Sequence, residues 1–185
     1  IANTVGHFEY FLKKEPRDTN FQLELFELQN LNDVLIFNED ANELARKIKA
    51  DVIYIDPPYN ARQYINFYHV LENLARWNKP EIFEGKSMKF LRNELKSGYS
   101  TASAPKLFND LVQHLNCKLI VVSYNNTYSA SSSASNNRIK EQEIFSILSK
   151  RGKVRKTEID YKSFNAGKTD LKNHQEYLFV CNVGD

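Results

Sequence analysis

Short runs of apolar residues along the chain predict the strands of a sheet. Three runs, rich in β-branched and aromatic residues, are typical of strands that are buried on both faces. Partial alternation over residues 21–28 predicts a strand with one exposed face. Residues 154–164 and 176–181 are expected to pair antiparallel across a polar connection around Gly167. The three apolar runs are residues 34–37, 52–55 and 119–122.

Apolar residues at helical spacing predict helices between these strands. Ser103 is expected to cap one helix, with Pro105 in its first turn. Gly152 is expected to close another helix at its C′ position. A short helix at residues 43–49 would join two strands into a right-handed, parallel βαβ unit. Residues 3–14 are expected to form a turn and a short helix, and the other helical segments are residues 68–77, 103–115 and 139–148.

This alternation of strands and helices predicts an α/β fold. We expect a mostly parallel sheet with helices on its faces and one antiparallel strand near an edge. Residues 78–102 are polar and are expected to form a long loop, while the serine-rich residues 129–137 are expected to be disordered. At 185 residues and 42% hydrophobic content, the chain fits one globular domain.

Composition restricts the location and the chemistry further. The sequence has no apolar run of about 18 residues and no signal peptide, so we expect a cytoplasmic protein without a membrane-spanning helix. Cys117 and Cys181 lack metal-site spacing and are expected to be small core residues. The net charge is +2, but residues 138–174 hold ten Lys or Arg and five Asp or Glu. That segment is either a solvated face or a surface that faces phosphates.

The most informative stretch is residues 52–60, Val-Ile-Tyr-Ile-Asp-Pro-Pro-Tyr-Asn. The two prolines end the apolar strand because neither can donate a hydrogen bond to a sheet. Asp56 and Tyr59 would therefore stand at the carboxyl end of a central strand, where open α/β sheets bind ligands. The plainer interpretation is a rigid turn in which Asp56 accepts hydrogen bonds.

Asp-Pro-Pro-Tyr after an apolar strand resembles motif IV of the S-adenosylmethionine-dependent amino-methyltransferases. The likeness is greatest to N(6)-adenine DNA methyltransferases of type IIS restriction–modification systems, and it implies a partial Rossmann-like fold. Further matching segments follow in the family's order. They are residues 3–6, 11–14, 56–64, 68–72, 123–126 and 176–180.

The resemblance assigns roles to residues of this chain. It implies that Asp56, Pro57 and Tyr59 are catalytic, and that Asp40, Ala41 and Asp56 bind the methyl donor. For Asp40 an alternative is that it caps the next helix. His69 is expected to be a core or surface histidine rather than a base. The residues expected to face DNA are Pro58, Asn60, Arg62, Gln63, Tyr64, Asn125 and Asn126.

Plainer alternatives remain for part of that set. Residues 62–64 could equally be polar loop residues, and Asn125 and Asn126 could form a turn at the end of a strand. One departure from the family is large, because the glycine-rich donor loop Phe-x-Gly-x-Gly is absent and Gly6, in Thr-Val-Gly-His, does not match it.

We therefore expect residues 1–185 to be an incomplete catalytic domain, a C-terminal fragment with the first two strands of the family upstream. Its sheet would then lack its middle strands. On its own it would bind the donor weakly or not at all and would be inactive, unless a second chain, as in a homodimer, fills the gap.

The implied reaction is methyl transfer from S-adenosyl-L-methionine to the exocyclic amine of a flipped adenine in double-stranded DNA, without a metal. A cognate restriction endonuclease would be a partner. Alternatives are an amino-methyltransferase for RNA adenine, for cytosine or for protein glutamine, although glutamine enzymes resemble Asn-Pro-Pro-Tyr rather than the Asp56 motif. Another alternative is a non-catalytic DNA-binding or dimerisation remnant.

Overall fold

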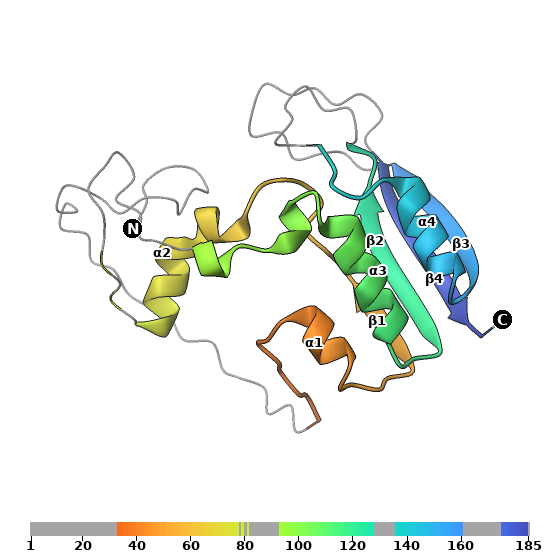
Figure 1. Ribbon diagram of the computed structural model, residues 1–185, viewed down its shortest axis with the longest axis horizontal. Helices are drawn as coiled ribbons and strands as arrows, with labels where there is room; N and C mark the ends of the chain where they lie inside the picture. Colours follow the sequence, from red (N-terminus) through yellow and green to blue (C-terminus); the bar gives the residue numbers. More distant parts are fainter. Residues whose placement is uncertain are drawn as a thin grey trace. The chain divides into compact units, whose positions relative to one another are not determined.

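A mixed, four-stranded sheet organises the larger part of the protein (Figure 1). The computed structural model describes residues 33–77, 79, 81, 93–127, 136–160 and 175–184. Two units share the chain: one contains Ile1–Glu39 and Tyr64–Leu95, and the other contains Asp40–Gln63 and Lys96–Asp185. The sheet belongs to the second unit.

The strand order is β1-β2-β4-β3, and the pairing is mixed. β1 is parallel to β2, whereas β4 is antiparallel to both β2 and β3. The expectation of a mostly parallel sheet is therefore not confirmed, because two of the three described pairings are antiparallel. One strand, β4, runs against the other three, and the predicted antiparallel pair at the chain's end is confirmed. The strands are β1 Val52–Ile55, β2 Leu119–Asn125, β3 Gly152–Asp160 and β4 Gln175–Val183.

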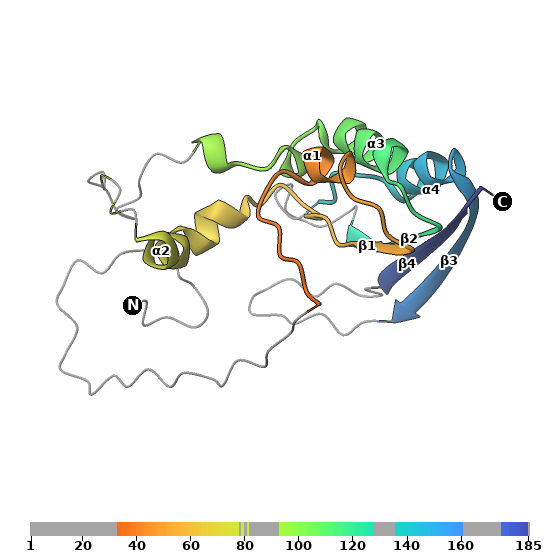
Figure 2. The same cartoon turned by 90° about the horizontal axis from the view of Figure 1, so that it is seen from below.

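Three helices, α1 Ala41–Ala45, α3 Ala104–His114 and α4 Glu141–Ser149, lie on one face of this sheet (Figure 2). Between helices and sheet is a core of buried apolar side chains, as expected when apolar positions recur at helical spacing. Cys181 belongs to this core, while Cys117 is half-buried against it. The largest fully buried side chains are Tyr124, Phe108, Phe179, Ile120, Ile139, Ile144 and Leu148.

The predicted strand at residues 34–37 is wrong. These residues have no regular structure, and the side chains of Leu35 and Ile36 are 82% and 89% exposed. An apolar run becomes a strand only when a neighbour takes up its backbone hydrogen bonds, and no described strand pairs with it. The βαβ unit built on that strand is wrong with it. The helix expected at residues 43–49 is α1, which begins earlier and ends at Ala45.

β1 has the predicted bounds, but it is not buried on both faces. Ile53 and Ile55 pack against the core, whereas Val52 and Tyr54 are 56% and 61% exposed. The reason is that β1 lies at an edge of the described sheet, and the described helices of this unit cover only one face. β2 also differs from expectation, because it continues beyond Val122 to Asn125.

Of the two predicted helix ends, the N-cap at Ser103 has the predicted position and the C′ position at Gly152 does not. Ser103 occupies the N-cap of α3 without a side-chain cap bond, and the hydroxyl of Thr101 instead accepts from the Ser103 N–H. α4 is capped by Lys150, so Gly152 lies one residue beyond C′ and begins β3. Glycine is required there for another reason: a Cβ on Gly152 would lie 1.8 Å from the carbonyl oxygen of Asn182.

The other unit contains helix α2 Tyr64–Arg76 and the short 3₁₀ helix η1 Asn93–Leu95. His69 on α2 is buried, which fits a core histidine. The predictions for residues 3–14, 21–28, 129–135 and the connection around Gly167 lie outside the described residues, as does much of the predicted loop at 78–102. Within the described part of the chain, no helix is both long and apolar enough to cross a membrane.

Candidate functional site

Asp56, Tyr59 and Ser123 form a cluster of polar groups at the carboxyl ends of β1 and β2. The hydroxyl of Tyr59 donates to Oδ1 of Asp56 at 2.9 Å, and the hydroxyl of Ser123 donates to the same oxygen at 3.0 Å. The two hydroxyl oxygens are 3.3 Å apart. Asp56 is exposed, while Tyr59 and Ser123 are half-buried, so the cluster presents a carboxylate that is oriented by two donors and open to a ligand.

The register of the parallel pair explains why these side chains meet. Ile55 is paired with Val122, and the residues that follow them, Asp56 and Ser123, therefore emerge side by side. Pro57 is buried and Pro58 is half-buried. Because the rings of both prolines fix φ, the turn after β1 is stiff, and it brings Tyr59 back towards Asp56.

Tyr124 packs against the ring of Tyr59 and hydrogen-bonds to its backbone. The two rings meet edge to face with centroids 4.8 Å apart. The carbonyl oxygen of Tyr59 accepts two hydrogen bonds, from the Tyr124 hydroxyl at 3.0 Å and from the Arg138 N–H at 2.8 Å. The Tyr124 hydroxyl in turn accepts from the Ile139 N–H at 3.1 Å. The loop after β1 is thus anchored to β2 and to the segment before α4.

Burial sets the protonation of both tyrosines. It raises the pKa of Tyr59 well above its ordinary range, and the negative charge of Asp56 acts in the same direction. Burial also raises the pKa of Tyr124 to about 12. Both phenols therefore keep their protons at neutral pH, and the Tyr59 hydroxyl is a hydrogen-bond donor to the carboxylate.

Glu176 adds a second carboxyl group to this region. It lies at the start of β4, where it is paired with Asn125 of β2. Its pKa is raised, first by burial and then by the negative charge of Asp56. The site therefore carries two acidic groups, and the charge of Asp56 acts on Glu176. Such a site favours a ligand that is cationic or that donates hydrogen bonds.

Gln63 and Asn60 are used inside the fold. The side-chain amide of Gln63 donates to the carbonyl oxygen of Ser97 at 2.9 Å and accepts from the Ser97 N–H at 2.8 Å. Asn60 accepts from the Arg62 N–H at 3.0 Å and forms an isolated bridge to Asn137. Arg62 and Tyr64 are exposed. Of these predicted DNA-facing residues, Gln63 and Asn60 help to shape the loop after β1.

Asn125 and Asn126 also hold the backbone at the end of β2. Oδ1 of Asn125 accepts from the Thr127 N–H at 3.3 Å and from its hydroxyl at 2.7 Å. Oδ1 of Asn126 accepts from the Gln175 N–H at 3.0 Å, next to the start of β4. These contacts favour the alternative of a strand-end turn over a pocket lining.

Asp40 caps helix α1. Its Oδ1 accepts from the N–H groups of Asn42 and Glu43 at 2.9 and 3.2 Å, so the capping alternative describes its contacts in this structure. Neither bond uses Oδ2, and Asp40 and Ala41 are both exposed. A capping carboxylate with one oxygen outside these two bonds can still accept from an amino group, and the binding of the methyl donor by Asp40 stays a prediction.

Asn42 joins α1 to α3. Its side-chain NH₂ group donates to the carbonyl oxygen of Leu107 at 2.9 Å and to Asp110 at 2.7 Å, and its Oδ1 accepts from the Tyr99 hydroxyl at 2.8 Å. Arg46 donates to Asp110 at 2.9 Å, and this contact holds the pKa of that carboxyl below its ordinary range. The position of Asp40 is therefore fixed through its neighbour on α1.

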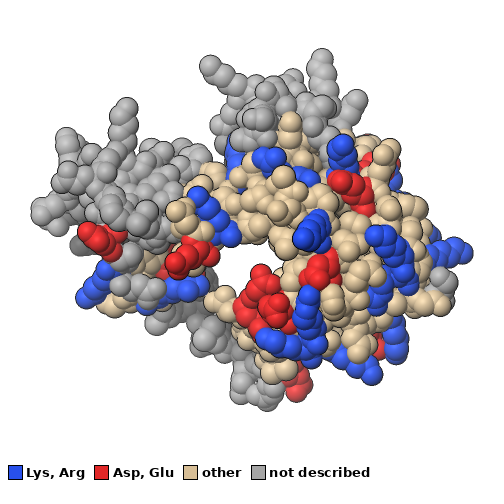
Figure 3. Space-filling model, viewed as in Figure 1, with Lys and Arg blue, Asp and Glu red and all other residues tan. Residues whose placement is uncertain are grey.

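Much of the described basic charge between residues 138 and 160 already has partners. Figure 3 shows basic side chains spread over the side of the molecule that carries α4 and β3. Lys156 pairs with Glu141 and Glu158, and Arg151 donates to the carbonyl oxygens at the end of α3. The other exposed cations in this range are Lys140, Lys153 and Arg155, while Lys150 donates to Oδ1 of Asn109. A phosphate-facing role for residues 138–174 stays a prediction, and residues 161–174 lie outside the described chain.

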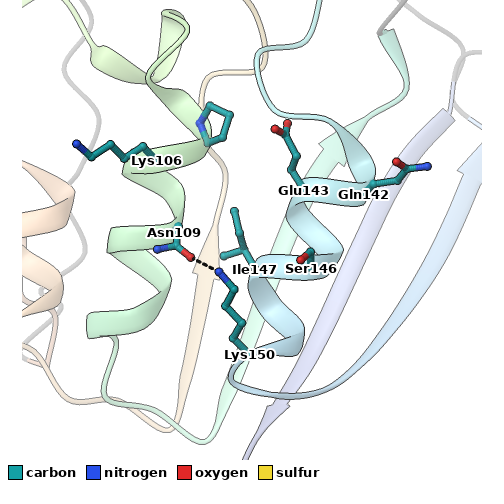
Figure 4. Close-up of a pocket in the computed structure, with 8 residues that line it drawn as sticks. Lys106, Asn109, Gln142, Glu143, Ser146, Ile147 and Lys150 are labelled. Carbon is teal, nitrogen blue, oxygen red and sulfur yellow. Dashed lines mark hydrogen bonds between the residues drawn. The ribbon is translucent and has the colours of Figure 1, made fainter.

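A separate hollow of about 460 Å³ lies between α3 and α4 (Figure 4). Lys150 crosses it to donate to Oδ1 of Asn109 at 3.0 Å, and Lys106 and Glu143 stand at its rim. None of its lining residues belongs to the Asp56 cluster. Among the described residues, no group of three or more His, Cys, Asp or Glu is placed to hold a metal ion.

Sequence reasoning missed the roles of Ser123, Tyr124 and Glu176. Residues 123–126 and 176–180 were expected as segments that match the family, but among them a role was predicted only for Asn125 and Asn126. The usable signal was the parallel pairing of two apolar runs, because it aligns the residue after each run. Because Ile55 of β1 pairs with Val122 of β2, the next residues, Asp56 and Ser123, are neighbours.

Comparisons of the sequence with a family model and with known proteins all give DNA methyltransferases. The model of the D12 class N6 adenine-specific DNA methyltransferase family matches residues 1–147. Modification methylase StsI of Streptococcus sanguinis is 40% identical over 184 residues, which are 97% of this chain and 27% of that protein. Type II methyltransferase M.FokI of Planomicrobium okeanokoites is 34% identical over 97% of this chain and 27% of its own length.

Type II methyltransferase M.NlaIII of Neisseria lactamica is 30% identical over 97% of this chain and 53% of its own length. The chain thus spans between about a quarter and about a half of these relatives. No solved structure matches the chain. Because the family model covers well over half of the sequence, this chain belongs to the D12 class N6 adenine-specific DNA methyltransferases.

Proposed function

We propose that the chain carries the adenine-binding and catalytic part of a restriction–modification methylase. The reaction moves a methyl group from S-adenosyl-L-methionine to the exocyclic amine of an adenine in double-stranded DNA. The observation that carries this proposal is the exposed carboxylate of Asp56, oriented by the hydroxyls of Tyr59 and Ser123 at the carboxyl end of β1. A cognate restriction endonuclease would act on the same DNA sites.

The difficulty of the reaction is the weak nucleophilicity of the adenine amine, whose lone pair is delocalised into the ring. A hydrogen-bond acceptor on each N–H draws the nitrogen towards tetrahedral geometry and restores the lone pair. Asp56 supplies one acceptor through its carboxylate, and the backbone carbonyl of Pro57 supplies the other. Proline suits this position because it fixes the backbone and has no N–H that competes.

An adenine inside a duplex cannot reach Asp56, so the base must leave the stack. Flipping costs a few kcal/mol, which stacking on an aromatic ring and edge hydrogen bonds partly offset. Tyr59 provides that ring, next to the carboxylate that receives the amine. When nitrogen and methyl carbon are held in line and close together, positioning accounts for most of the acceleration.

The residues of this chain fit part of a methyl-donor site. Asp40 offers a carboxylate for the adenine amine of the donor, Ala41 adjoins it, and the acidic pair Asp56 and Glu176 suits a sulfonium cation. The bound donor would supply an activated methyl group and leave as a neutral thioether, while the adenine amine loses one proton to solvent. The six glycines of the chain include no Gly-x-Gly, so we propose weak donor binding by residues 1–185.

Radioactive methyl transfer with the full-length product of the gene that contains this chain tests the proposal. Unmethylated duplex DNA, single-stranded DNA and RNA are offered in parallel, and the labelled base is identified after hydrolysis. We expect N6-methyladenine in duplex DNA. Label in cytosine, or in RNA alone, would replace the proposal with one of the other amino-methyltransferases.

A non-catalytic DNA-binding remnant is the second candidate. Titration calorimetry of S-adenosylmethionine separates the two. A remnant predicts no donor binding by the full-length gene product and no label in any nucleic acid, together with measurable DNA binding. Tight donor binding by residues 1–185 alone would refute our proposal of a weak donor site.

A further inference from the structure

We propose that Ser123 is a positioning residue that holds the carboxylate of Asp56 in the orientation needed for the target amine. This inference rests on the proposed function, because it assigns Ser123 a part in that reaction. Ser123 comes from β2, 67 residues away from Asp56 along the chain, so only the folded sheet brings the two together.

The two hydroxyl donors bind only one of the two carboxylate oxygens of Asp56. Tyr59 and Ser123 each have one hydroxyl proton, and both protons point at Oδ1, at 2.9 and 3.0 Å. Neither bond uses Oδ2. Because two donors hold Oδ1, rotation of the carboxylate is restricted, and the exposed Asp56 keeps Oδ2 outside these two bonds, so that it can accept from an amine N–H.

Ser123 is the steadier of the two donors. It lies within β2, where its neighbour Val122 pairs with β1 on one side and Ser123 itself faces Leu178 of β4 on the other. Tyr59 lies in the loop after β1 and has a second task, since its ring must accept the flipped base. If the ring shifts to stack, the Tyr59 hydroxyl moves with it, whereas the Ser123 hydroxyl stays beside Asp56.

This division predicts a specific kinetic signature. We assign no DNA contact to Ser123, so replacing its side chain should leave DNA binding intact. The loss should lower the rate of the chemical step, because Asp56 would then meet the amine in a range of orientations. A hydrogen bond to a charged group is worth a factor of about 10 to 100, which sets the size of the expected loss in rate if the orientation of Asp56 limits the chemical step.

The test compares Ser123→Ala, Ser123→Cys and Ser123→Thr in the full-length gene product, with unmethylated plasmid DNA and labelled donor. Cysteine is close in shape to serine but is a weak donor, whereas threonine keeps the hydroxyl and suits a strand. Ser103→Ala is the matched control, since Ser103 is exposed and its side chain makes no cap bond. Circular dichroism checks the fold of each variant.

We expect Ser123→Ala and Ser123→Cys to lower kcat about 10- to 100-fold with KM for DNA nearly unchanged. Ser123→Thr and Ser103→Ala should stay within about threefold of wild type. If Ser123→Ala does not fold, the comparison of cysteine with threonine decides.

Two results would overturn the inference in different ways. A folded Ser123→Cys protein with wild-type kcat, or a threonine variant as slow as the cysteine one, would remove Ser123 from the reaction while the proposed function stands. A wild-type protein that labels no adenine would instead remove the proposed function, and the role of Ser123 would fall with it.

Discussion

The hydroxyl of Tyr59 donates to Oδ1 of Asp56 at 2.9 Å across the two prolines of one turn. The aromatic ring that would receive the base and the carboxylate that would receive its amine are thus linked by a hydrogen bond. Tyr124 packs on the same ring from the core side, at 4.8 Å between centroids. The link means that the ring and the hydroxyl of Tyr59 have separable roles.

Tyr59→Phe and Tyr59→Ala separate those roles. The phenylalanine variant keeps the ring and loses one of the two donors to Asp56, so we expect kcat to fall only about 3- to 10-fold. The alanine variant also loses the stacking surface, worth about 1–3 kcal/mol per base, and should fall about 100-fold or more. Methyl transfer measures the rate, and 2-aminopurine fluorescence in the DNA reports flipping. Equal losses in both variants would contradict a stacking role.

Asp56→Ala in the full-length gene product should abolish methylation and leave DNA binding largely intact. The carboxylate is exposed, and the contacts that anchor the loop after β1 run through the Tyr59 carbonyl oxygen rather than through Asp56. Methyl transfer and a DNA-binding titration on the same protein check both halves of this expectation. Activity within about tenfold of wild type would show that another group accepts from the amine.

Local sequence was sufficient to locate the centre of this site. The bounds of β1 and the placing of Asp56 and Tyr59 at its end followed from an apolar run that two prolines stop, and both features are encoded within nine residues. The antiparallel pair β3 and β4 was also predicted, from two expected strands that are joined by a polar connection.

Contacts that depend on distant pairing were not predictable in the same way. The approach of Ser123 to Asp56 is set by the register of β1 against β2, which no local pattern contains. At residues 34–37 a strand was predicted that the structure does not contain. Their apolar pattern suits a strand, but a strand forms only when another strand pairs with it. The sheet's mixed character has the same origin, since it depends on β4 entering between β2 and β3.

Gly152→Ala should weaken the pairing of β3 with β4. A Cβ at this position would lie 1.8 Å from the carbonyl oxygen of Asn182, so one backbone must move, and we expect a loss of about 1–3 kcal/mol in the free energy of unfolding. Gly98→Ala is the comparison, because its Cβ would meet only the flexible end of Leu107, at 2.5 Å. Urea unfolding measures both. An equal loss for the two variants would show that the close backbone approach is not limiting.

Asn42→Ala should destabilise the contact between α1 and α3. The variant leaves the Tyr99 hydroxyl and the Leu107 carbonyl oxygen without the partner they have now, at a cost of about 1–3 kcal/mol. Asn116→Ala, at an exposed position, should cost much less. Urea unfolding gives the loss. If Asn42→Ala matched the control, the network would not be what fixes α1 and Asp40.

Glu176 should make the stability of the protein depend on pH. Burial and the negative charge of Asp56 raise its pKa above the ordinary value of 4.5. Below that value both the folded and the unfolded protein are protonated at this residue, and burial carries no charge penalty. As the pH rises through the window above 4.5, the unfolded chain releases its proton first, so the free energy of unfolding falls. The free energy of unfolding stops falling once the pH exceeds the raised pKa of Glu176, because the residue is then ionised in both states.

Glu176→Gln removes this ionisation and tests the sign. The variant should match wild type in acid and be more stable than wild type at neutral pH, as measured by urea unfolding across the pH range. Glu94→Gln, at an exposed glutamate, is the control variant. Asp56→Asn should reduce the effect at Glu176 without abolishing it, because burial is the larger cause and the charge of Asp56 the smaller. A Glu176→Gln curve parallel to that of wild type would show that folding does not raise the pKa of Glu176.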